Sequence, residues 1–244
     1  MLKLSHGLMF KESPWYNSDM QRKVSFAPGE YFHIYNRGAH KADIFLEDGD
    51  YRRFILLLYI TNNTETIHLS SINRSGKKDD LFSILRPERL VDIGAYCLMP
   101  NHFHLLVHSR NDTGISLFMK KLLTAYSMFF NKKHEHSGAL FQGPFQAQHV
   151  ATDQHLKHLF AYIHLNPLSV KYPDWKEKGI RNTKYAKDFL GSFHYSSYLD
   201  FIGSGRDQKV ILSAEVFPKY FGSERDFDDF LTDWLTTVST MKQE

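Results

Sequence analysis

The sequence predicts an α+β protein with a ferredoxin-like split β-α-β-β-α-β arrangement, an antiparallel sheet that is followed by a further helix and a C-terminal helical extension. Three observations predict this class. Short segments alternate apolar and polar residues, as half-buried strands do, and longer segments repeat apolar residues at the spacing of an amphipathic helix. The two kinds of segment also follow each other along the chain in the order that this arrangement requires.

The first half of the chain supplies a strand, a helix and a strand pair. Residues 30–38 (EYFHIYNRG) alternate as a strand that Gly38 closes. A helix is expected from Asp50 to the TNNT segment at 61–64, because Tyr51, Phe54, Ile55 and Leu58 form an apolar stripe. Residues 90–109 (LVDIGAYCLMPNHFHLLVHS) predict two strands folded about Pro100 and Asn101.

The second half adds two helices and one strand. From Thr113, apolar residues keep a helical period while lysines lie off the stripe. Residues 144–151 (PFQAQHVA) alternate as a fourth strand, and a third helix is expected from Asp153 to Pro167. Beyond about residue 172 the pattern changes, and residues 223–238 predict a last helix. We therefore expect an irregular N-terminal arm at 1–28, a main domain at 29–172 and a C-terminal helical extension at 173–244, which is too short to bury much core alone.

Composition narrows the class of protein. Hydrophobic residues make up 42% of the chain and charged residues 23%, values typical of a folded globular protein. The net charge of +3 permits binding to nucleic acid without requiring it. The single cysteine excludes an internal disulfide, and no apolar run approaches the roughly 20 residues that span a bilayer. We expect a cytoplasmic protein with no membrane segment and no export signal.

Two histidines stand out in the predicted strand pair. Side chains alternate faces along a strand, so His102 and His104 share one face while Phe103, Leu105 and Val107 share the other. The Cα atoms of the two histidines then lie about 6.6 Å apart, close enough for both rings to reach one divalent metal ion. Such a site needs a third ligand from elsewhere. The pattern alone fits partly exposed sheet histidines equally well.

The third predicted helix carries a candidate tyrosine. Tyr162 and Asn166 lie four residues apart on one flank of its buried stripe. Two histidines, one amide oxygen and one tyrosine suit phosphodiester cleavage through a covalent phosphotyrosine. Two alternatives stay open at this point. Tyr162 and Asn166 also fit an ordinary boundary tyrosine and a residue at a helix end, and the same spacing occurs at Tyr59 and Asn63.

Several motifs together resemble a known family. The segments YFHIYNRG, AYCLMPNHFHLLV, LFQGPFQAQHV, YIHLNPLSV and YSSYLDFIG occur in this order. They resemble the REP-associated tyrosine transposases, relatives of the single-tyrosine insertion-sequence transposases that carry a His-hydrophobic-His (HUH) motif. The resemblance covers roughly residues 28 to 225, and it makes residues 29–172 an HUH transposase-like catalytic domain.

The resemblance implies a role for each candidate. His102 and His104 match the metal ligands, Tyr162 matches the nucleophile in preference to Tyr59, and Asn166 takes the place of the third metal-binding side chain. It implies Mg²⁺ or Mn²⁺ as cofactor and single-stranded or hairpin DNA, such as a repetitive extragenic palindrome, as substrate. A 5′-phosphotyrosine intermediate and a free 3′-OH are also implied, in a monomer or homodimer.

Basic residues along the chain are candidates for contacts with DNA, and two other functions compete with a transposase. We expect contacts with DNA phosphates from basic residues after the first strand and on the second helix, namely Arg37, Lys120, Lys121, Lys132 and Lys133. Ordinary solvent-exposed surface residues would explain the same lysines equally well. A histidine-triad hydrolase requires His-x-His-x-His, and position 106 is leucine. A domesticated hairpin-DNA-binding protein without turnover stays open as the alternative.

Overall fold

The computed structural model describes residues 24–67, 81–180 and 182–240. Most of the predicted arm at 1–28 lies outside these residues. Four strands form one antiparallel sheet in the order β2-β3-β1-β4; they are β1 (Tyr31–Arg37), β2 (Val91–Met99), β3 (His102–Ser109) and β4 (Gln146–His149). With α1 after β1 and α3 after β3, this order confirms the predicted split β-α-β-β-α-β class.

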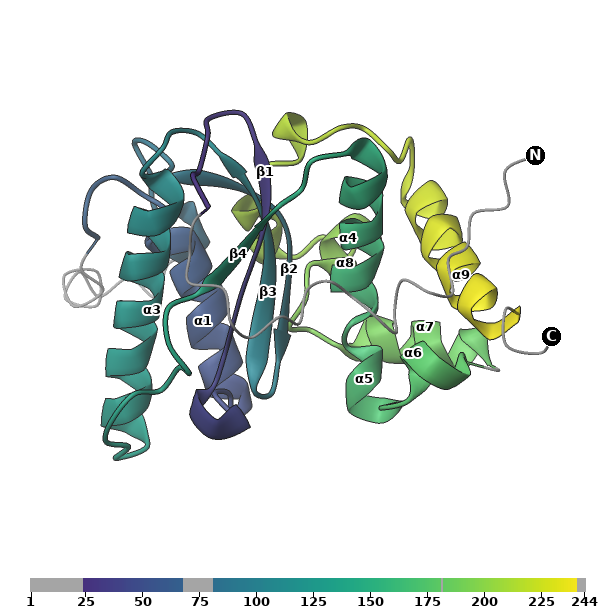
Figure 1. The fold of residues 1–244 in the computed structure, drawn as a ribbon, viewed down its shortest axis with the longest axis horizontal. Helices are drawn as coiled ribbons and strands as arrows, with labels where there is room; N and C mark the ends of the chain where they lie inside the picture. The colour runs from purple at the N-terminus through teal and green to yellow at the C-terminus, as the bar shows by residue number, and fades with distance from the viewer. Residues whose placement is uncertain (1–23, 68–80, 181, 241–244) are drawn as a thin grey trace.

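Helices cover both faces of the sheet (Figure 1). Helices α1 (Asp48–Ile60) and α3 (Gly114–Lys133) lie on one side and α4 (Asp153–Leu165) on the other. Alternation along β3 explains the two faces, because Phe103 packs with the α1 and α3 residues while Leu106 packs with Leu159 and Ile163 of α4. The even-numbered face of β3, which carries the histidines, is therefore the face that α4 covers.

The C-terminal part adds short helices beyond α4. They are α5 (Leu168–Lys171), α6 (Trp175–Lys178), α7 (Thr183–Ser192), α8 (Tyr198–Phe201) and α9 (Glu224–Thr240). Residues from these helices, among them Trp175, Phe227 and Leu231, form an apolar cluster with Ala161 and Leu165 of α4. The sequence predicted α9 but not α5 to α8. The boundary expected at residue 172 falls between α5 and α6, and the division into three parts stays a prediction.

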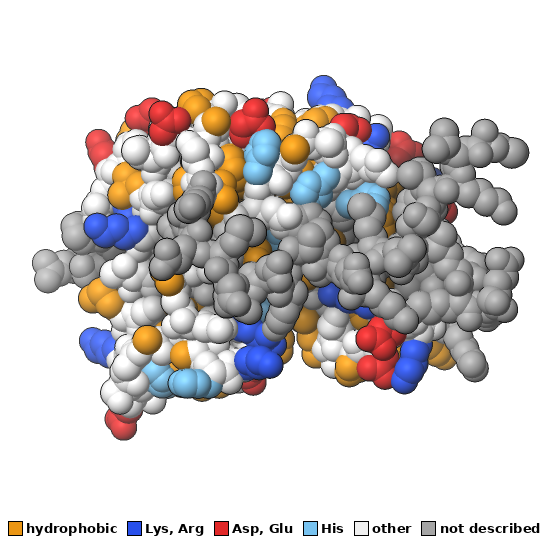
Figure 2. All heavy atoms as spheres, viewed as in Figure 1, with side chains coloured by type: hydrophobic (Ala, Val, Ile, Leu, Met, Phe, Trp, Pro, Cys, Tyr) orange, Lys and Arg blue, Asp and Glu red, His pale blue; other side chains and the backbone are white. Residues whose placement is uncertain are grey.

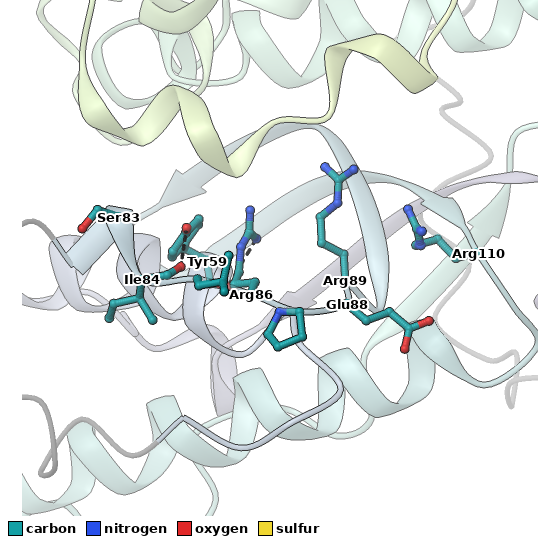
Figure 3. A pocket seen from close by; sticks show the side chains of 9 residues that line it. Tyr59, Ser83, Ile84, Arg86, Glu88, Arg89 and Arg110 are labelled. Carbon is teal, nitrogen blue, oxygen red and sulfur yellow. Dashed lines mark hydrogen bonds between the residues drawn. The ribbon is translucent and has the colours of Figure 1, made fainter.

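Arginine side chains join the C-terminal part to the sheet. Arg206 donates to buried Asp200 at 2.7 and 2.6 Å and to the Tyr96 hydroxyl at 2.9 Å. Near the end of α1, Arg86 and Arg89 donate to Val210 O at 3.1 Å and Ser213 Oγ at 2.7 Å. A cavity of about 440 Å³ lies at this seam (Figure 3) and holds none of the predicted site residues; it is lined by Tyr59, Ser83, Ile84, Leu85, Arg86, Pro87, Glu88, Arg89 and Arg110.

One buried histidine makes the fold sensitive to acid. His164 of α4 is fully buried, its Nδ1–H donates to Phe160 O, and its Nε2 lies 2.8 Å from Ser197 Oγ. Burial lowers the pKa of His164 to about 3. In the unfolded chain the histidine has a pKa of about 6.5 and takes up a proton between pH 7 and pH 5, whereas the buried ring stays neutral. This difference lowers the free energy of unfolding by about 2 kcal/mol between pH 7 and pH 5.

Urea unfolding at the two pH values checks this expectation. The His164→Gln variant should lose about 2 kcal/mol less than the wild type over the same interval, because it carries no proton-binding group at this position. Equal losses in the two proteins would contradict the assignment of the acid sensitivity to His164.

Candidate active site

The register of the sheet gathers polar side chains on the face beneath α4. Tyr35 of β1 and Cys97 of β2 pair directly with His104, and Arg37 pairs with His102. Directly paired residues point to the same face of a sheet. The two predicted histidines therefore share their face with the polar residues of β1, and their ring centroids lie 5.0 Å apart.

Helix α4 brings the predicted tyrosine to this face. The Tyr162 ring lies edge-on to His104, with ring centroids 5.2 Å apart. Asn166, four residues further and therefore one turn along the same side, is buried at the end of α4. The alternative Tyr59 lies on α1, against the opposite face of the sheet, and its hydroxyl donates to Ile84 O at 2.8 Å. Geometry thus associates Tyr162, and not Tyr59, with the histidine pair.

A third histidine, which the sequence analysis did not single out, completes the cluster. His33 of β1 is buried, and its Nε2 lies 2.9 Å from Nδ1 of His104. Its ring centroid is 6.0 Å from that of Tyr162. The alternation in residues 30–38 already put His33 on the polar side of its strand, but only the register with β3 shows that it meets His104.

Burial keeps the three imidazoles neutral. It lowers the pKa of His33 to about 3 and that of His102 to about 4, and the positive charges of Arg37 and Lys176 act in the same direction on His102. The pKa of His104 is also lowered, first by burial and then by the neighbouring histidines. Neutral imidazole is the form that binds a metal ion, because one ring nitrogen then keeps a lone pair.

Hydrogen bonds determine which nitrogen of each ligand candidate is open. Asn101 Nδ2 donates to Lys41 O, which turns its Oδ1 toward the His102 Nδ1–H at 2.7 Å. His102 Nε2 therefore keeps the lone pair. In the tautomer in which His104 Nδ1–H donates to His33 Nε2, His104 Nε2 also keeps its lone pair. Within the described residues His104 Nε2 is buried and has no hydrogen-bond partner, as expected of a ligand atom.

The donor set fits a divalent cation. Nδ2 of the Asn166 carboxamide is also buried without a hydrogen-bond partner in the described part of the chain, and a flip of the amide would present its oxygen there. The ranges 24–67, 81–180 and 182–240 contain no group of three or more His, Cys, Asp or Glu suited to a metal ion. Two imidazoles and one amide oxygen would fill three coordination positions of the ion. The remaining positions would be open to water and phosphate oxygens, which Mg²⁺ and Mn²⁺ accept as ligands.

The basic residues predicted to contact DNA are divided between two layers. Arg37 lies beside His102 on the site face. Lys121 and Lys133 lie on α3, on the other side of the sheet, where Lys121 donates to Glu65 O at 2.8 Å and Lys133 pairs with Asp50 at 2.6 Å. Lys120 and Lys132 are exposed on the same helix. On the side of the molecule that Figure 2 shows, basic and acidic side chains are interspersed over the described residues.

Comparison with known proteins assigns the central segment. The model of the family described as "Transposase IS200 like" matches residues 73–166. This segment is similar to the IS200-like transposases. It contains His102, His104, Tyr162 and Asn166. The resemblance inferred from the sequence motifs is confirmed at the level of this transposase family, while His33 lies outside the matched segment.

The chain is similar to a solved structure of a REP-associated tyrosine transposase bound to a REP hairpin, with a TM-score of 0.43 and 13% sequence identity over 84% of this chain and 92% of that one. No curated protein sequence matches the chain. No helix among the described residues is long and apolar enough to cross a membrane.

Proposed function

We propose that this protein is a transposase that binds single-stranded or hairpin DNA and cleaves and rejoins it through a 5′-phosphotyrosine at Tyr162. The observation that carries the proposal is the position of Tyr162, whose ring lies 5.2 Å from His104 on a sheet face that holds three neutral imidazoles. The match to IS200-like transposases supports DNA as the substrate. The same arrangement supports an enzyme rather than a DNA-binding protein without turnover.

The reaction follows from the chemistry of a phenol. Tyr162 Oη attacks the phosphorus of a phosphodiester and forms an O–P bond, while the bond from phosphorus to the 3′ oxygen breaks. The phenol proton passes to water, and the leaving 3′ oxygen takes up a proton as a free 3′-OH. The downstream strand stays attached through its 5′ phosphate. Attack by a 3′-OH on this phosphotyrosine reverses the step and joins strands.

A divalent metal ion would complete the site. His102 Nε2, His104 Nε2 and the Asn166 carboxamide oxygen would hold Mg²⁺ or Mn²⁺, which would polarise the phosphate oxygens and make the phosphorus more reactive. The protein contributes the neutral form of both rings, the orientation of each through Asn101 and His33, and the burial that excludes competing water.

Strand-specific labelling tests the proposed function. Hairpin oligonucleotides with single-stranded flanks are incubated with the purified chain and Mg²⁺ or Mn²⁺, then separated on a denaturing gel. A 3′ label should migrate with the protein, and a 5′ label should appear in a free fragment that a polymerase can extend. Attachment of the 5′ label to the protein would refute the polarity of cleavage. Hairpin binding without an adduct under either metal would favour the domesticated DNA-binding protein.

His33 should control metal affinity without being a ligand. Its hydrogen bond orients His104, and loss of such a bond in other metal sites weakens metal affinity or activity by about 10–100-fold. We expect this loss in His33→Leu, measured as Mn²⁺ binding by calorimetry without DNA. His136→Leu is the control, because His136 is exposed and its ring bonds to Asn131 Oδ1, beyond the end of α3. Wild-type affinity in His33→Leu would show that His104 needs no such support.

A further inference from the structure

Lys176 places a positive charge beside Tyr162 and has no part in the cleavage step proposed for the tyrosine and the histidines. It belongs to α6, beyond the segment that matches the family model. Its Nζ lies 4.5 Å from the centroid of the Tyr162 ring. The side chain is partly buried, and within the described residues its ammonium makes no hydrogen bond or ion pair. Lys178, two residues further on the same helix, is exposed and pairs with Asp174 at 2.7 Å.

The charge of Lys176 faces the histidines as well as the tyrosine. It contributes to the lowered pKa of both His102 and His104, and Cys97 on the central part of the same face lies near enough to affect Lys176 in turn. Burial lowers the pKa of Lys176 to about 8, so the amine is still mostly protonated at pH 7. One positive charge is thus placed beside the Tyr162 ring and close to the histidine pair.

A purely structural role explains this placement poorly. Removing an ammonium from water without an anionic partner costs free energy, and the stem of a lysine is long enough to carry the charge back to solvent. A contact with an aromatic face returns only about 0.5–2 kcal/mol. Among the residues that the structure describes, the ammonium therefore has no anionic partner, and a phosphodiester bound for attack by Tyr162 would supply one.

We propose that the Lys176 ammonium binds a non-bridging oxygen of the phosphate that Tyr162 attacks and stabilises the negative charge that develops there during cleavage. This inference rests on the proposed function. It assigns a catalytic residue to the C-terminal part of the chain, so the active site is complete only when α6 packs beside α4. The ligand at this position is the scissile phosphate itself.

The decisive variant is Lys176→Met, with Lys178→Met as its matched control on the same helix. We expect adduct formation to slow by about 10²–10³-fold in Lys176→Met, the loss typical of one preorganised electrostatic contact. Its melting temperature should be unchanged or higher, because a desolvated charge is removed. Lys178→Met should form the adduct within twofold of the wild-type rate. Lys176→Arg keeps the charge and should recover part of the lost rate.

A modified substrate distinguishes phosphate binding from a structural effect. Once the cleavage position is mapped, a methylphosphonate there replaces one charged oxygen by methyl. If Lys176 contacts that charge, the methylphosphonate should weaken binding to the wild type more than to Lys176→Met, a non-additive result in a double-mutant cycle. Additive losses, or an unchanged adduct rate in Lys176→Met, would overturn the inference while leaving the proposed function intact. Absence of any adduct with the wild type would overturn both.

Discussion

Replacing Tyr162 by phenylalanine is expected to abolish the covalent protein–DNA adduct and to leave hairpin binding in place. The substitution removes only the oxygen that attacks phosphorus, while the ring keeps its edge-on contacts with His104 and His33. Loss of a nucleophile from a covalent mechanism typically lowers the rate by roughly 10⁴-fold or more. The free energy of unfolding should change by no more than about 1 kcal/mol. Denaturing gels with 3′-labelled hairpin DNA measure the adduct, and fluorescence anisotropy measures binding.

Tyr35→Phe is the matched control for this prediction. Tyr35 lies on the same sheet face, with its ring 5.9 Å from His104, and is a second tyrosine that could reach the site. Burial raises the pKa of its phenol, which makes it a weaker acid than an exposed tyrosine. We expect Tyr35→Phe to form the adduct. If Tyr162→Phe still formed it and Tyr35→Phe did not, the nucleophile would be the strand tyrosine and the proposed mechanism would be wrong in its central residue.

The sequence predicted the sheet and the long helices because their periods are local properties. Alternation in residues 102–109 put His102 and His104 on one face, and the stripe of α4 put Tyr162 and Asn166 on one flank. The register between β1 and β3 is a long-range property, set by packing and by connections distant in sequence. For this reason the hydrogen bond between His33 and His104 could not be predicted, although both residues lay on expected strands.

Short helices explain the other omissions. Helix α6 spans Trp175–Lys178, one turn, which is too short to show a periodic stripe, so Lys176 had no signal that connected it with Tyr162. The lysines of α3 were predicted to contact DNA, but the sequence could not show on which side of the sheet they lie. Their helix was correctly expected, but a helical pattern does not say which face of the sheet the helix covers. Lys121 and Lys133 consequently lie in the layer opposite α4.

The structure also predicts a large effect for His104→Gln on metal binding. His104 Nε2 is a proposed ligand atom, and it is buried without a hydrogen-bond partner among the described residues. The substitution would therefore remove one of the donors that hold the cation. We expect Mn²⁺ affinity to fall by more than the roughly 10–100-fold typical of a supporting residue. Glutamine keeps much of the side-chain volume and a hydrogen bond to His33, which limits the loss of stability.

Thermal unfolding with and without Mn²⁺ measures this effect independently of activity. A metal ion at 100 times its dissociation constant should stabilise the wild type by about 2.7 kcal/mol, and EDTA should remove that gain. His104→Gln should show almost none of it. His108→Gln should retain it, because His108 lies four residues along the same face, where its Nδ1 bonds to Asp92 at 3.2 Å instead of facing Tyr162. Equal stabilisation of all three proteins would place the metal elsewhere and leave the histidine pair without its proposed role.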